Sequence, residues 1–83
     1  MIKSKKYAVY YRSMPAILDT FIKQDGRISL SKDGVRKVNE HSCPRMTLIV
    51  EPTTTEWLDK ERLKQLEQLL DQLCSNNQIV SWS

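Results

Sequence analysis

Short apolar stretches predict three strands along the chain. Residues 5–12 contain three tyrosines and a valine, which suit a pleated, half-buried surface. The residues expected on its buried face are Tyr7, Val9 and Tyr11, with Ala8 and Tyr10 on the opposite face. The run 46–50 is the most hydrophobic of the chain and rich in β-branched residues, so we expect a central strand there. Residues 78–82 are expected to form a final strand.

Residues 13–24 allow two interpretations. As a helix, the segment has a suitable cap in Ser13 and a proline in its first turn, Pro15. Its apolar residues then fall on one stripe, made of Ile17, Leu18, Phe21 and Ile22. The alternative is a strand that runs into a hairpin turn at Asp25-Gly26. We prefer the helix because Gly26 would then follow its end, where a left-handed residue is favoured.

A short hairpin is expected next along the chain. Residues 27–31 alternate polar and apolar side chains, and Asp33-Gly34 is a two-residue turn signal. Residues 35–38 would form the second arm. Residues 39–44 are mostly polar and are expected to be a loop that leads into the central strand.

The C-terminal helix is the clearest element in the sequence. Its apolar residues form one stripe, made of Leu63, Leu66, Leu70, Leu73 and Cys74. Asp59 is the preferred cap. The alternative start, Thr53 with Glu56 in a capping box, would carry Asp59 onto the apolar face. Ser75, Asn76 and Asn77 end the helix.

These elements predict one α+β domain over residues 1–83. We expect a small, mostly antiparallel sheet of four or five strands, packed by one long C-terminal helix and a short N-terminal helix. A chain of 83 residues has room for one hydrophobic core. A deep substrate chamber would consume much of that core, so the size favours a binding surface over an enzyme's cavity. We expect no catalytic activity and no cofactor.

Cysteine use and the lack of long apolar runs bear on the compartment. Cys43 and Cys74 are expected to be free thiols in a reducing cytoplasm, with one disulfide as the alternative. No apolar run approaches the ~20 residues of a membrane span, and the basic N-terminus lacks the apolar stretch of a secretory signal. The sequence therefore predicts a cytoplasmic protein with no membrane partner.

The reactive residues of the chain do not form a recognisable catalytic or metal-binding pattern. His41 lies two residues from Cys43, but nothing around them resembles an oxyanion turn or a flanked nucleophile. We interpret them as an exposed loop histidine beside a small apolar cysteine. No CxxC, HExxH or glycine-rich phosphate-binding spacing occurs, so no metal site is predicted.

Charge is distributed unevenly along the chain, whose net charge is +3. Residues 1–46 carry ten Lys and Arg against four acids, and residues 47–83 carry three against six. Such asymmetry can mark an anion-binding face. The candidate nucleic-acid contacts are Arg27, Lys32, Arg36 and Lys37 on the expected hairpin, with Lys5, Lys6 and Arg12 beside tyrosines that could stack on bases. A solvated hairpin, with lysines that protect a sheet edge, explains the same charges.

Two tryptophans and one leucine suggest a different partner. Trp57, Leu69 and Trp82 could leave an apolar patch for another protein or for a second copy of the chain. We therefore expect a small protein-binding module, such as an inhibitor, adaptor or regulator of the kind that phages and plasmids encode. The alternative is a nucleic-acid-binding protein that uses the basic N-terminal half.

Overall fold

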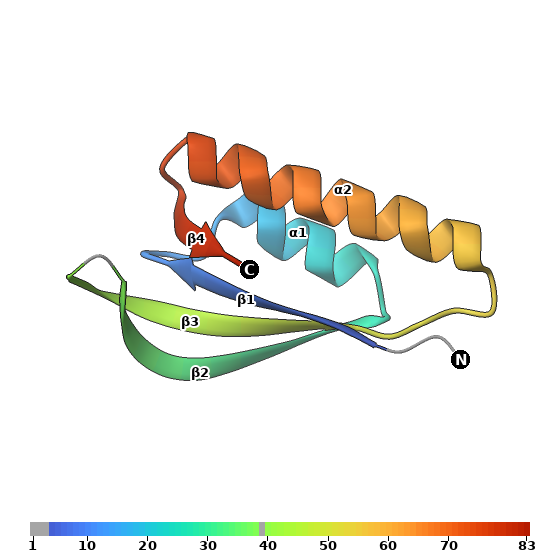
Figure 1. The fold of residues 1–83 in the computed structure, drawn as a ribbon, viewed down its shortest axis with the longest axis horizontal. Helices are drawn as coiled ribbons and strands as arrows, with labels where there is room; N and C mark the ends of the chain where they lie inside the picture. Colours follow the sequence, from blue (N-terminus) through green and yellow to red (C-terminus); the bar gives the residue numbers. More distant parts are fainter. Residues whose placement is uncertain (1–3, 39) are drawn as a thin grey trace.

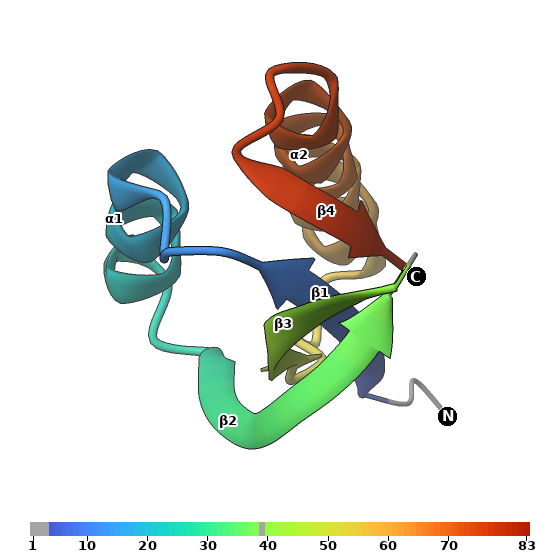
Figure 2. The same cartoon turned by 90° about the vertical axis from the view of Figure 1, so that its left-hand side faces the viewer.

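A computed structural model describes residues 4–38 and 40–83. The elements in chain order are β1 (Lys5–Tyr11), α1 (Ala16–Gln24), β2 (Ile28–Val38), β3 (His41–Val50), α2 (Glu56–Ser75) and β4 (Ile79–Trp82). The strands form one sheet in the order β2-β3-β1-β4, with every neighbouring pair antiparallel. Both helices lie on the same side of this sheet, as Figures 1 and 2 show. The predicted α+β class is confirmed, with four strands and two helices.

The connectivity is that of a split βαβ unit used twice. Helix α1 joins β1 to β2, and α2 joins β3 to β4; in each case one antiparallel strand lies between the two strands that the helix connects. Helix α2 could also have connected β3 and β4 as parallel neighbours. Those two strands do run in the same direction, but β1 separates them, so no parallel pair forms.

The core lies between the sheet and the helices. Tyr7 and Val9 of β1 are opposite Leu48 and Met46 of β3, and all four side chains are at most 2% exposed. Helix α2 covers them with three leucines that are equally buried, Leu66, Leu70 and Leu73. Burying one such side chain stabilises the fold by about 1.5–3 kcal/mol, so this one stripe is enough to hold the helix on the sheet.

Residues 13–24 contain a helix, as preferred, although it begins later than Ser13. The N-cap position is Pro15, and no side chain caps the first turn. Leu18 and Ile22 are buried against the sheet. Asp25 ends the helix by donating its backbone N–H to the carbonyl of Ile22, so Asp25-Gly26 joins a helix to a strand and is not a hairpin turn.

The predicted turn at Asp33-Gly34 is wrong, because β2 runs through it as one strand. The pairing of β2 with β3 shifts register between Lys32 and Val35, which marks a bulge, and Gly34 takes the positive φ of 86° there. The Asp33 carboxylate accepts hydrogen bonds from the hydroxyls of Thr47 and Ser31. The hydrogen bond from Thr47 of β3 therefore holds Asp33 within one continuous strand, where the sequence predicted two short strands joined by a turn.

The expected loop at residues 39–44 is also wrong, because β3 begins at His41. Asn39 lies outside the described residues, and Glu40 has a φ of 68°, the left-handed conformation of a tight turn. Residues 41–44 pair with β2 alone, since the pairing of β3 with β1 ends at Arg45. The end of the β2–β3 ribbon therefore projects beyond the rest of the sheet; we call its residues 32–38 and 40–44 the arm.

Helix α2 begins at Glu56, so the preferred cap at Asp59 is wrong. As the alternative start implied, Asp59 lies on the buried side and is only 8% exposed. Its carboxylate accepts hydrogen bonds from the Thr53 backbone N–H at 3.0 Å, from the Thr53 hydroxyl at 2.9 Å and from the Arg27 guanidinium at 2.6 Å. These partners let an acid occupy an otherwise apolar position, which no periodicity rule allows for.

Candidate nucleic-acid interface

One face of the sheet carries no helix. On β1 the side chains that point to this side belong to Lys6, Ala8 and Tyr10. Their direct partners on β3 are Ile49, Thr47 and Arg45, in that order. Figure 2 shows both helices on the other side of the strands. We call this surface the open face; it is available to a ligand without disturbing the core.

Tyr10 and Arg45 are directly opposite each other on this face, and both are half-buried. Among the described residues, neither side chain makes a hydrogen bond or an ion pair within the chain. The Nε of Arg45 is buried and has no acceptor. A buried donor without a partner is unfavourable, so the guanidinium has hydrogen-bonding capacity that the fold leaves unused.

The arm adds further positive charge beside this pair. Arg36 is opposite Cys43, which shares the side of β3 that Arg45 occupies. The Thr47 and Ser31 hydroxyls, together with the charges of Arg45 and Arg36, hold the pKa of the exposed Asp33 below its usual value. Asp33 therefore stays ionised and lies close to both arginines. Lys32 and Lys37 are exposed on the arm and occupy the opposite side of the ribbon.

Arg27, which directly precedes β2, is paired with acids of the chain, unlike the predicted contacts on β2 itself. Its guanidinium donates to Asp59 and lies 3.4 Å from the Asp25 carboxylate. Arg62 of α2 pairs with the same Asp25 at 3.2 Å. Burial opposes ionisation of Asp25, but the Arg27 backbone N–H and the Arg62 side chain outweigh it, so the pKa of Asp25 is lowered. This cluster joins α2 to the start of β2 and leaves Arg27 little capacity for a ligand.

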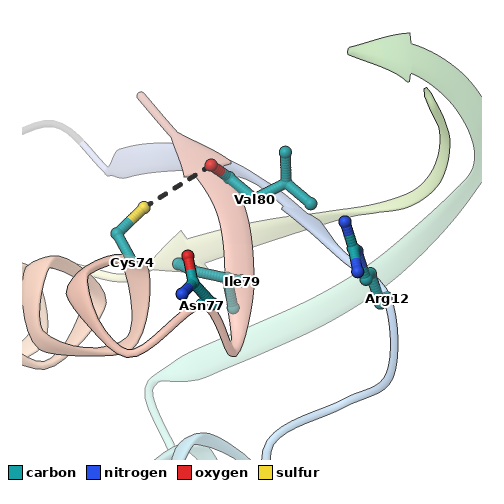
Figure 3. A pocket seen from close by; sticks show the side chains of 5 residues that line it. All are labelled: Arg12, Cys74, Asn77, Ile79 and Val80. Carbon is teal, nitrogen blue, oxygen red and sulfur yellow. Dashed lines mark hydrogen bonds between the residues drawn. The ribbon is translucent and has the colours of Figure 1, made fainter. Parts of the chain in front are cut away.

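Lys5, Lys6 and Arg12 lie in three different places. Lys6 is exposed on the open face, whereas Lys5 is on the helix side, where its ammonium lies 5.8 Å from the centre of the Tyr7 ring. Arg12 is exposed after the end of β1 and lines a pocket with Cys74, Asn77, Ile79 and Val80 (Figure 3). The seven predicted contacts therefore do not form one patch; Lys6 and Arg36 are the two that share the open face.

The pocket in Figure 3 contains a thiol that is not activated. Cys74 Sγ lies 3.8 Å from the Val80 carbonyl oxygen. Burial, together with the nearby Asp71 carboxylate, raises the pKa of the Cys74 thiol. A raised pKa keeps the sulfur protonated, which makes it a weak nucleophile. Both cysteines are free, and Cys43 interacts with the backbone carbonyl of His41, not with its imidazole.

The three predicted partner-binding residues are also separated. Trp57 is 68% exposed in the first turn of α2. Leu69 lies toward the other end of that helix and lines a groove against α1 with Ile17 and Phe21. Trp82 packs on the Tyr7 ring at a centroid distance of 6.0 Å and donates its indole N–H to Asp71. Trp57, Leu69 and Trp82 therefore do not form one apolar patch.

Sequence reasoning missed Arg45 as a site residue. It placed this position between a loop and the central strand, where no side-chain direction can be assigned. The alternation of Arg45, Thr47 and Ile49 would have placed Arg45 opposite the core, had the strand been extended toward its N-terminus. Tyr7 and Tyr11, which the sequence offered for stacking with Tyr10, are core residues.

Within the residues that the structure describes, no three His, Cys, Asp or Glu side chains are grouped so that they could hold a metal ion. Neither of the two helices combines the length and the apolar character that a membrane crossing requires, over the same residues. Comparisons with protein families, with curated proteins and with solved structures found no match to this chain.

Proposed function

We propose that this chain binds nucleic acid through the open face of its sheet, with the arm at one end of the binding surface. The observation that carries this proposal is the placement of Lys6, Arg36 and Arg45 on a face that the core does not use. We call these three residues the face cations. Phosphates contribute most of the affinity in nucleic-acid complexes, and they are neutralised by lysine and arginine side chains presented in this way.

The distribution of acids supports the same assignment. Helix α2, on the far side of the sheet, carries five acids and three bases. On the open face and the arm, the described acids are Asp33, which lies close to two arginines, Glu40 at the turn, and the exposed Glu51, which follows Ile49 on the same side just after β3. A polyanion would therefore be attracted to one side of the molecule and repelled by the other, which orients it during approach.

The outer edge of β2 is poorly suited to adding a strand from another protein. Edge strands are protected from such pairing by bulges and by charged side chains. Strand β2 has a bulge between Lys32 and Val35 and carries three cations, Lys32, Arg36 and Lys37. An edge protected in this way favours a ligand that contacts side chains over one that extends the sheet.

The experiment is a fluorescence anisotropy titration with short labelled oligonucleotides, DNA and RNA, at low salt. We expect Lys6→Glu to weaken binding to every sequence to a similar extent, because a phosphate contact carries no sequence information. Lys64→Glu is the matched control, since Lys64 is an exposed lysine on α2. Equal losses from both variants, or no binding by the unmodified chain, would contradict the proposal.

A protein-binding role remains the second candidate, and one observation favours it. The groove between α1 and α2 has a volume of about 350 Å³, and its apolar lining residues are Ile17, Phe21 and Leu69. Ile17 is 56% exposed there, beside the apolar side chains of Phe21 and Leu69. If this groove holds a protein, Ile17→Lys should abolish capture of that protein from nuclease-treated lysate, and Lys6→Glu should leave it intact.

A further inference from the structure

Tyr10 lies on the open face, where two of its three nearest neighbours in the sheet have small side chains. It is opposite Ser81 on β4 and Arg45 on β3, and Ala8 precedes it on the same side of β1. Two of these three neighbours cannot cover an aromatic ring. Within the described residues the one pair of packed rings is Tyr7 with Trp82, so the Tyr10 ring stacks on no other ring of the chain.

The centre of the open face is partly apolar, and charge lies around it. Ala8 is half-buried next to Tyr10 on β1, and Ile49 is half-buried opposite Lys6 at the other end of that strand, while Arg36 lies on the arm. A double helix presents phosphates and sugars on its outside and keeps the faces of its bases stacked. Such a ligand could use the cations but would gain nothing from the apolar centre.

Arg45 is placed to hold a phosphate next to that centre. It is directly across from Tyr10, so their Cβ atoms are about 5 Å apart. Its guanidinium makes no close ion pair among the described residues, although the charge of Asp33 acts on it, and a planar fork of donors matches the oxygens of a phosphate. A phosphate at Arg45 would bring the attached base within reach of the Tyr10 ring.

We infer that the nucleic acid bound by this face is single-stranded, with one unpaired base stacked on Tyr10 and an adjacent phosphate held by Arg45. This inference rests on the proposed function and narrows it to a class of ligand. Unpaired bases expose their faces, and stacking on an aromatic side chain is available to all of them. The site should therefore accept different sequences.

The test compares oligothymidine and oligouridine of about 12 nucleotides, a length within the roughly 4–16-nucleotide range of small single-strand-binding domains. A duplex of the same length serves as unlabelled competitor. We expect the single strands to bind at least about tenfold more tightly than the duplex, because only they gain the stacking contact. The DNA and RNA arms report whether the sugar hydroxyl contributes.

Variants of Tyr10 separate stacking from charge. Tyr10→Leu keeps an apolar side chain and removes the aromatic face, so we expect a roughly 5- to 100-fold loss for the single strands and little change for the duplex. Tyr10→Phe is the control that keeps the ring, and its affinity should remain close to that of the unmodified chain. Ultraviolet cross-linking of bound oligouridine to the unmodified chain should attach the adduct to Tyr10, which requires no substitution.

The outcomes distinguish this inference from the function on which it rests. Equal binding of duplex and single strands, with no effect of Tyr10→Leu, would overturn the inference and leave nucleic-acid binding standing. No binding of any oligonucleotide would remove both. If Tyr10→Leu does not fold, the comparison of duplex with single strands and the cross-linked position, both measured on the unmodified chain, still decide the question.

Discussion

The salt dependence of the binding constant should report how many cations of the chain contact the ligand. Each phosphate neutralised on a single strand contributes about −0.7 to the slope of log K against log salt. The three face cations, Lys6, Arg36 and Arg45, therefore predict a slope of about −2. Raising the salt from about 50 mM to about 200 mM would then weaken binding roughly 20-fold. Lys32 and Lys37 lie on the other side of the ribbon and would steepen the slope to about −3.5 if the strand also wrapped around the arm.

Substitution of one cation turns this slope into a test of position. We expect Arg45→Gln to make the slope shallower by about 0.7, because the variant loses one phosphate contact and keeps a polar, uncharged side chain. Anisotropy titrations of a labelled single strand at four or more salt concentrations would measure both slopes. A slope for the unmodified chain shallower than about −0.7, or the same slope with and without Arg45, would refute the assignment of these cations to the ligand.

Three further predictions concern the stability of the fold. Leu70→Ala should lower the free energy of unfolding by about 3–5 kcal/mol in urea titrations, since Leu70 is fully buried; a loss below ~1 kcal/mol would show that the core is misplaced. Tyr7→Phe removes a hydrogen bond of 2.9 Å to the Glu67 carboxylate and should cost about 1.5–3 kcal/mol, whereas the loss should vanish in a background that already carries Glu67→Leu. The lowered pKa values of Asp25 and Asp59 mean that their stabilising contribution is fully present above about pH 4 and is lost as the pH falls through the folded-state values. The midpoint of urea unfolding should therefore decrease between pH 5 and pH 3, roughly, and an unchanged midpoint would contradict the ion-pair cluster.

The fold was predictable where a short-range pattern decides the structure. Alternation located β1, the leucine spacing located most of α2, and the expected final strand corresponds to β4. Long-range contacts decided two of the places where prediction failed. Asp33-Gly34 has the composition of a turn, but the Thr47 hydroxyl on β3 holds Asp33 within a continuous strand. The sequence pattern placed Asp59 at the helix cap and not on the buried side, because Arg27, which pairs with it in the structure, is distant in the sequence.

For the candidate site, the sequence predicted the positive charge but not the residues that carry it. The excess of Lys and Arg in the first half indicated an anion-binding surface, but not which cations the fold would use internally. Arg27 and Lys37 looked equivalent on the expected hairpin; in the structure Arg27 is paired with Asp59 and Lys37 is exposed. Arg45 could be assigned to a face only once the full length of β3 and its register with β1 were known.

No described residue between Ile28 and Met46 belongs to the main core. Apart from Cys43, which is fully buried, and Gly34, which has a positive φ, substitutions along this part of the ribbon therefore carry a small folding penalty, because they leave the packing between sheet and helices unchanged. Natural variation in this segment can therefore adapt to the ligand, whereas substitutions at the positions that face the helices would lower the stability of the fold. The same property makes the arm the natural place to attach probes or to exchange residues when the specificity of this small scaffold is to be redesigned.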